Sequence, residues 1–144
     1  MNSENGVAIV AMGTWYAKLT GDYLGKLPHI LSGALARLPL KVIWRLSGRI
    51  PSNIGNNTEV MKWLPQNDLL GHSKTVVFIN HAGTNGIYEA IYHGVPMVNI
   101  PLGADHFDNA AKVQKKGMGK TVFYSDITEE SLYQTIMEVV NNNT

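Results

Sequence analysis

Residues 75–94, "TVVFINHAGTNGIYEAIYHG", hold the clearest architectural signal in the chain. An apolar run, "VVFI" at 76–79, leads into small residues, and a helical pattern follows until Gly94 stops it. Continuous apolar strands that alternate with helices are typical of a parallel sheet covered on both faces. The stretch therefore predicts one strand–turn–helix unit of such a sheet, with bare backbone in the turn.

The same alternation runs through the rest of the chain. Apolar runs predict further strands at 6–13, 41–46, 58–63, 96–101 and 119–124. Helical spacing predicts helices at 22–38, 84–93, about 108–116 and 128–141, and a connector with one helical turn at 64–72. Asp108 and Thr128 are the expected N-caps of the last two helices. We predict an α/β fold, in which residues 1–144 form one Rossmann-like, doubly wound parallel sheet of about six strands.

The composition excludes several classes of protein. Charged residues are 16% of the 144 residues and the net charge is +1, which does not indicate a nucleic-acid or membrane-surface binder. No segment approaches the roughly 18 apolar residues of a membrane span, and "MNSENG" lacks a signal-peptide pattern. The absence of cysteine excludes disulfides and thiolate metal sites, and no cluster of other ligands predicts a metal.

Two Asn-Asn-Thr sequences, at 56–58 and 142–144, are N-glycosylation sequons on Asn56 and Asn142. They are compatible with a history in the secretory pathway. Short sequons also arise by chance, and the second lies at the chain end, so both interpretations stay open.

The turn after the 75–80 strand is the expected ligand site, because doubly wound sheets bind ligands beyond the carboxyl ends of their strands. A helix that begins there offers unpaired N–H groups and a positive dipole end, and small residues let an anion approach. His81, Thr84 and Asn85 can add side-chain donors. The turn predicts phosphate binding, although glycine-containing turns are also common in α/β domains without this role.

Other loops at the same edge carry groups that suit a nucleotide. Thr14 follows the first strand in "AMGTW", and "KWLPQND" places Trp63 and Gln66 after the third strand. An aromatic plane beside an amide suits a base and its ribose. Glu89, on the first turns of the 84–93 helix, can accept two ribose hydroxyls. A core role for Trp63 and a solvated role for Glu89 are the competing interpretations.

The loop "LGADHFDN" at 102–109 follows the fifth strand. There a carboxylate, Asp105, stands beside an imidazole, His106, and the pair can grip vicinal sugar hydroxyls. The alternative is a plain loop that caps the next helix.

These segments resemble a known family in order and spacing. "WLPQNDLLGHSKT" (63–75), "FINHAGTNGIYEAIYHGVPMVNIPL" (78–102) and "ADHFDN" (104–109) closely resemble the C-terminal half of UDP-glycosyltransferases, the group that includes the UDP-glucuronosyltransferases. "GNNT", "LLGHSK", "DH" and "VQKKGMG" look more like the ceramide galactosyltransferase branch, whereas "GTNGIYEAIYHGVPMV" looks like the glucuronosyltransferase branch, so the resemblance selects no single member. The resemblance spans essentially the whole chain and implies the C-terminal, donor-binding half of a GT-B glycosyltransferase.

The resemblance also implies roles for single residues. Trp63 is expected to stack on the uracil, Gln66 to bind ribose or base, and Glu89 to bind the ribose hydroxyls. Asp105 and His106 are expected to hold the sugar. The residues expected around the pyrophosphate are Thr14, Arg45, His81, Gly83, Thr84, Asn85 and Gly86.

Two positions depart from the family pattern. Ala82 stands in the middle of a segment that is usually His-Gly-Gly. If this position needs a positive φ, alanine costs about 1 kcal/mol. His106 ends a loop that is commonly Phe-Ala-Asp-Gln, which leaves the sugar open between galactose, glucose and glucuronic acid.

For the intact enzyme, the resemblance implies inverting transfer of a hexose or glucuronic acid from UDP to a hydroxyl of a small lipophilic or lipid acceptor. The acceptor-binding N-terminal domain, the catalytic base and a C-terminal membrane tail are expected outside this chain, with the enzyme on the lumenal side of the endoplasmic reticulum membrane. We therefore expect a soluble fragment without catalytic residue, cofactor or metal. Its expected partners are a UDP-sugar and the N-terminal domain, and a second copy is a further candidate. Half of a nucleotide-sugar epimerase, or a non-catalytic nucleotide-binding module, is the alternative.

Overall fold

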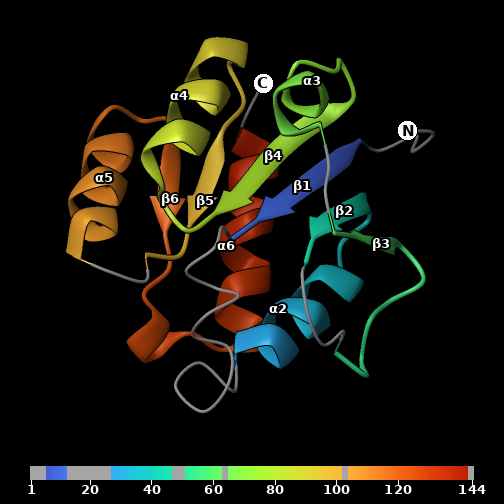
Figure 1. Cartoon of the computed structure of the whole chain (residues 1–144). Helices are drawn as coiled ribbons and strands as arrows, with labels where there is room; N and C mark the ends of the chain where they lie inside the picture. Colours follow the sequence, from blue (N-terminus) through green and yellow to red (C-terminus); the bar gives the residue numbers. More distant parts are fainter. Residues whose placement is uncertain (1–5, 13–26, 47–50, 63–64, 102–103, 143–144) are drawn as a thin grey trace.

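The computed structural model describes residues 6–12, 27–46, 51–62, 65–101 and 104–142, without the side chains of 104, 105 and 142. Within these ranges, parallel strands form one sheet in the order β3-β2-β1-β4-β5-β6 (Figure 1). The strands are β1 Val7–Ala11, β2 Lys41–Arg45, β3 Thr58–Met61, β4 Thr75–Asn80, β5 Met97–Asn99 and β6 Gly119–Thr121. The order reverses direction between β1 and β4, as in doubly wound sheets, and confirms the predicted fold class.

Helices cover both faces of the sheet. They are α2 Leu27–Ala36, α3 Gln66–Leu70, α4 Thr84–His93, α5 Ala104–Lys115 and α6 Glu129–Asn142. α2 and α6 pack on one face, and α3, α4 and α5 pack on the other (Figure 1). In β4, Val77 and Ile79 face the first layer while Phe78 faces the second, which explains why this strand is apolar at successive positions. Among the described residues, no helix is long and apolar enough to span a membrane.

The ends of two helices confirm their sequence signals. Thr128 caps α6, because its Oγ1 accepts from the backbone N–H of Ser131 at 3.0 Å. Ser131 Oγ in turn accepts from the N–H of Thr128 at 2.9 Å, which completes a reciprocal capping box. Gly94, the last residue of the 75–94 stretch, ends α4 with φ of 69°.

Two elements differ most from their predicted bounds, while β3, β5 and α2 end two residues earlier than predicted. α5 begins at Ala104, so Asp105 and His106 lie in its first turn and Asp108 lies inside the helix instead of capping it. No glycine or proline separates 104 from 115, so nothing in the backbone delays the helix. β6 ends at Thr121 because a 3₁₀ turn follows at Tyr124–Asp126. The predicted start of the first helix, 22–26, lies outside the described residues.

The strands end together, and this places several side chains in one row. Ala11 pairs in register with Arg45 on one side and with Asn80 on the other. The full row of strand ends is Met61, Arg45, Ala11, Asn80, Asn99 and Thr121. Polar and charged groups therefore gather at the carboxyl edge of an otherwise apolar sheet.

The approach to edge strand β3 depends on one side-chain amide. Asn57 Nδ2 donates to three backbone carbonyls at and beyond the end of α2, those of Leu35 (2.9 Å), Leu38 (3.3 Å) and Leu40 (3.0 Å). Carbonyls at a helix C-terminus lack donors from a following turn. The Leu35 carbonyl also accepts the backbone N–H of Leu38 at 3.2 Å, and the Asn57 amide adds a donor for all three carbonyls. The neighbouring Asn56 is exposed.

We expect Asn57→Asp to destabilise the fold by roughly 3 kcal/mol, because a carboxylate cannot donate and would face three carbonyl oxygens. Asn56→Asp is the matched control and should change the free energy of unfolding by less than about 0.5 kcal/mol. Urea unfolding of both variants measures the difference. Equal effects would show that the Asn57 amide does not hold this segment.

Candidate functional site

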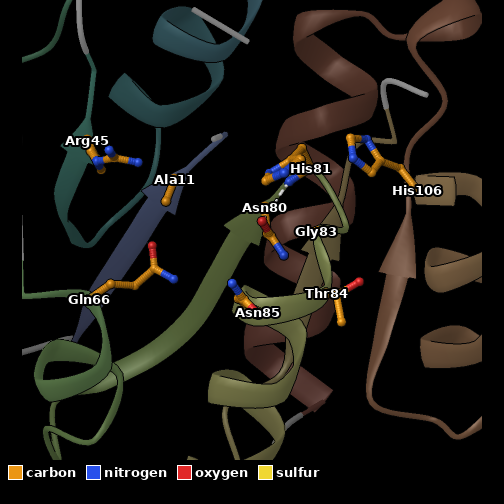
Figure 2. Close-up of a pocket in the computed structure, with 10 residues that line it drawn as sticks. Ala11, Arg45, Gln66, Asn80, His81, Gly83, Thr84, Asn85 and His106 are labelled. Atoms are coloured by element: carbon orange, nitrogen blue, oxygen red, sulfur yellow. Dashed lines mark hydrogen bonds between the residues drawn. The ribbon is translucent and has the colours of Figure 1, made fainter. Parts of the chain in front are cut away.

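A pocket of about 400 Å³ opens at the carboxyl edge, where β1, β2 and β4 end and α4 begins (Figure 2). Arg45 and Gln66 lie on one side of it, and His106 and Thr84 on the other (Figure 2). Its described lining is Ala11, Arg45, Gln66, Asn80, His81, Gly83, Thr84, Asn85, Gly86 and His106. None of these residues is acidic and one is a guanidinium, so the lining favours an anion.

The start of α4 presents backbone donors to this pocket. Gly83 is the N-cap, with φ of −72° and ψ of 145°, and no side chain caps the helix. The N–H groups of the first turn have no partner within a helix, and the helix dipole makes this end positive. Thr84 and Asn85 are exposed at the same place and add side-chain donors. The geometry predicted for an anion-binding turn is therefore present.

Side chains approach two glycines closely, Gly83 at the N-cap of α4 and Gly86 in its first turn. A Cβ on Gly83 would lie 2.5 Å from His81 Nε2, and one on Gly86 would lie 3.1 Å from Asn80 Nδ2. The positive φ instead falls on Ala82, at 70°. The departure from the family pattern thus sits at the position with left-handed backbone, where alanine carries strain of about 1 kcal/mol.

Hydrogen bonds from two elements hold this strained turn. Asn80 Oδ1, at the end of β4, accepts from the backbone N–H of His81 at 2.9 Å. Asn109 on α5 donates from Nδ2 to the carbonyl of Ala82 at 3.0 Å and to Thr84 Oγ1 at 3.4 Å. The turn is therefore fixed to the sheet below it and to the neighbouring helix.

Asn80 and Asn109 were not among the predicted site residues. Asn80 is only 1% exposed, its oxygen is fixed by the His81 N–H, and its Nδ2 has no partner within the described part of the chain. The sequence did contain one sign of its role, because Asn80 is a polar residue at the end of a buried apolar strand. Asn109 gave no comparable signal, because its contact depends on how α5 packs against the turn.

The two histidines of the pocket contact each other. Their ring centroids are 4.7 Å apart and nearly perpendicular, and His106 is 8% exposed. Burial, and then the proximity of His106, lower the pKa of His81 to about 4, which the backbone of Ala11 only partly opposes. His81 is therefore neutral at pH 7 and supplies one ring N–H instead of a positive charge.

Gln66 and Glu89 are joined to each other. Gln66 Nε2, in the first turn of α3, donates to Glu89 Oε1 on α4 at 3.1 Å. Gln66 lines the pocket, whereas Glu89 is half-buried and is not one of the described lining residues. Glu89 Oε1 is thus engaged by Gln66, whereas Oε2 forms no hydrogen bond with another described residue.

Three predicted residues are not tested by this geometry. Thr14 and Trp63 lie outside the described residues, and of Asp105 only the backbone, in the first turn of α5, is described. The stacking of a base on Trp63 stays a prediction. Within the described ranges, no group of three potential metal ligands lies together.

A solved structure shares this architecture. Os79 from O. sativa, in complex with UDP, superposes with a TM-score of 0.80 and 25% sequence identity, covering 96% of this chain and 32% of that one. The fold is that of a domain of GT-B glycosyltransferases, as predicted.

Sequence comparison identifies the family. The chain belongs to the UDP-glucoronosyl and UDP-glucosyl transferase family, whose pattern it matches over residues 1–144. It is 51% identical over 140 residues to 2-hydroxyacylsphingosine 1-beta-galactosyltransferase of Homo sapiens, covering 97% of this chain and 25% of that protein. It is 44% identical over 141 residues to UDP-glucuronosyltransferase 2B17 of Homo sapiens, covering 98% and 26%. The chain spans about a quarter of the length of these relatives.

Ala82→Gly should release backbone strain of about 1 kcal/mol but remove a buried methyl worth about 0.8 kcal/mol. The two terms nearly cancel, so we expect the free energy of unfolding to change by only about 0.2 kcal/mol. Ala90→Gly is the matched control, because Ala90 is equally buried but lies inside α4. It should lose about 2 kcal/mol. Thermal unfolding compares them, and an equal loss in both variants would show that the left-handed backbone of Ala82 carries no strain.

The stability of the fold should fall as the pH drops from 6.5 to 4 because of His81. The unfolded histidine binds a proton near 6.5 and the folded one only near 4, so acid favours the unfolded state in this window, by up to about 3 kcal/mol. His81→Gln should remove this part of the pH dependence, and His29→Gln, at an exposed site, should keep it. Urea unfolding at a series of pH values tests this. Parallel curves for wild type and His81→Gln would contradict it.

Proposed function

We propose that residues 1–144 form the donor-binding domain of an inverting UDP-glycosyltransferase and bind the UDP moiety of a UDP-sugar. The observation that carries the proposal is the pocket at the start of α4, where uncapped backbone N–H groups and Arg45 converge without any acidic lining residue among those described. The UDP present in the related Os79 structure supports the same choice of ligand.

In this proposal the diphosphate lies on the first turn of α4. The N–H groups of 84–86, the side chains of Thr84 and Asn85, and neutral His81 donate to its oxygens, and Arg45 balances its charge. During transfer, negative charge grows on the departing UDP. Donors fixed in place before the reaction stabilise this charge without reorganisation, which is the main catalytic contribution expected of this half.

The nucleoside is proposed to extend toward α3. Glu89 would accept ribose hydroxyls through the carboxylate oxygen that Gln66 does not occupy, and Gln66 would bind from the pocket wall. Trp63, three residues before Gln66, is proposed to stack on the uracil. Thr14 is proposed to approach the phosphates from the loop after β1.

The sugar is proposed to lie near the N-terminus of α5, against Asp105 and His106. His106 is in place beside the proposed phosphate site, in contact with His81. Imidazole offers its two ring nitrogens in different directions from the fork of a glutamine amide, which suits a different arrangement of hydroxyls. We therefore propose galactose as the first donor sugar, with glucuronic acid next. The names of the galactosyltransferase and glucuronosyltransferase relatives support this pair.

Acceptor binding and proton removal are assigned to the N-terminal domain of the intact enzyme. That enzyme is proposed to act on a lipid or small lipophilic hydroxyl at the lumenal face of the endoplasmic reticulum membrane. This chain alone is then expected to transfer no sugar, because the base and the acceptor site supply much of the rate. A nucleotide-sugar epimerase would need carboxylates in the cleft, and the described lining has none.

Titration with UDP and with uridine tests the proposal. Millimolar UDP should shift the backbone amides of 83–86 in NMR spectra, and uridine should shift them far less. Arg45→Met should weaken UDP about tenfold, about 1.4 kcal/mol, and leave uridine unchanged. Arg37→Met is the matched control. Arg37 directly follows α2 and forms a salt bridge with Glu130 of α6, and it is not one of the described lining residues. If UDP leaves amides 83–86 in place, or if both arginine variants behave alike, the site assignment is wrong.

A further inference from the structure

Asn99, the last residue of β5, is a polar side chain buried in the sheet close to the nucleotide pocket. It is 0% exposed, and neither its Nδ2 nor its Oδ1 has a hydrogen-bond partner within the described part of the chain. It is not one of the described lining residues of the pocket. A buried amide without a partner costs about 1–3 kcal/mol, so nearly all buried amides in folded proteins are hydrogen-bonded. The surroundings of Asn99 therefore indicate that a further polar group binds there.

The register of β4 and β5 places Asn99 beside Asn80. Phe78 pairs with Met97, and both face the layer of α3, α4 and α5. Two residues further on, Asn80 pairs with Asn99, and the alternation of side chains along a strand puts this pair on the same face. The Nδ2 of Asn80 is buried on that face, since a Cβ on Gly86 of α4 would lie 3.1 Å from it. Two amides with unused hydrogen-bonding atoms thus lie side by side on adjacent strands.

The spacing and the chemistry of these two amides suit a water molecule. Adjacent strands lie about 4.8 Å apart, which is close to the span of two hydrogen bonds that share one oxygen. Asn80 Oδ1 already accepts from the N–H of His81, so Asn80 offers its Nδ2, a donor (Figure 2). Water can accept from this donor and donate to Asn99 Oδ1. A metal cation is disfavoured, because it would face the N–H groups of Asn80.

We propose that an ordered water is bound between Asn80 and Asn99, and that Asn99 acts through it as a positioning residue for the anion-binding turn. Asn80 Nδ2 donates to the water, and the water donates to Asn99 Oδ1. The bridge holds the plane of the Asn80 amide, whose oxygen accepts from His81 at the start of the turn. The backbone carbonyl of Asn80 is held by the same neighbouring strand, because it accepts from the N–H of Ile100 at 2.8 Å.

The effect on ligand binding rests on the proposed function of the pocket. Ala82, next to His81, has a φ of 70°, so the turn is strained and depends on the groups that brace it. Without the bridge, the Asn80 amide is free to turn, and the N–H groups at the start of α4 lose part of their fixed direction. Binding of a diphosphate should then weaken. Uridine lacks the phosphates that these N–H groups are proposed to contact, so its binding should not change.

The bound water is tested first, in the absence of any nucleotide. Rotating-frame NMR spectra of the wild-type chain should show a direct dipolar contact between water and the side-chain amide protons of Asn80 and Asn99, opposite in sign to chemical exchange. Asn99→Leu, which is similar in size but has no polar atom, should abolish the contact at Asn80. Asn99→Ser, whose hydroxyl can hold water, should retain it. A wild-type spectrum without this contact at Asn80, or a direct hydrogen bond between the two amides, would overturn the proposal.

The positioning role is tested by titration with UDP and with uridine. Asn99→Leu should weaken UDP about fivefold and leave uridine unchanged, whereas Asn99→Ser should keep the wild-type affinity for both. Val98→Ala is the matched control, because Val98 is equally buried in β5 but faces the layer of α2 and α6. It should lower the melting temperature without changing the ratio of the UDP and uridine affinities.

The two measurements separate this inference from the proposed function. If wild type shows the water contact but binds no UDP, the proposed function and the positioning role fail while the water site stands. If wild type binds UDP and Asn99→Leu or Val98→Ala changes the affinity ratio equally, Asn99 is not a positioning residue. The wild-type spectrum decides the water site even if Asn99→Leu does not fold.

Discussion

The shared register of the parallel strand ends is the constraint on which the rest of the site depends. The ladder places Ala11 between Arg45 and Asn80, so a small side chain separates a cation from the strand that leads into α4. Because hydrogen bonds along each strand fix this register, a slip of one residue would turn Arg45 to the opposite face. The chemistry of the edge is therefore set by backbone pairing that extends deep into the apolar core.

The positive field at the pocket does not come from a charged His81. Burial and the contact between His81 and His106 keep the His81 ring neutral, so the positive field comes from the α4 N-terminus and from Arg45. The neutral His81 ring and the fixed backbone N–H groups would orient a ligand by directional hydrogen bonds, whereas Arg45 would attract it by charge. Orientation and attraction are thus assigned to different groups, and neither depends on protonation near pH 7.

The sequence predicted the sheet and its covering helices because those features depend on local periodicity. Apolar runs such as 76–79 and the cap at Thr128 act within a few residues of themselves. The start of α5 was placed too late because Asp108 is a good capping residue in isolation, while helix geometry already suits the residues before it. The left-handed φ of Ala82 was open in the sequence, since it accompanies hydrogen bonds from Asn80 and Asn109 that form only in the folded chain. Tertiary contacts of this kind leave no local pattern to read.

α5 supplies two side chains to the pocket and the turn beside it within about one helical turn. Its first turn holds His106 in the pocket, and three residues later Asn109 secures the carbonyl of Ala82. A substitution that tilts or slides the helix to admit another ligand would also shift the amide that braces the turn. Under the proposed assignment of His106 to the sugar, donor selectivity and the support of the turn are linked through one helix, and new substrates are most easily accommodated by side-chain exchange that leaves the helix axis in place.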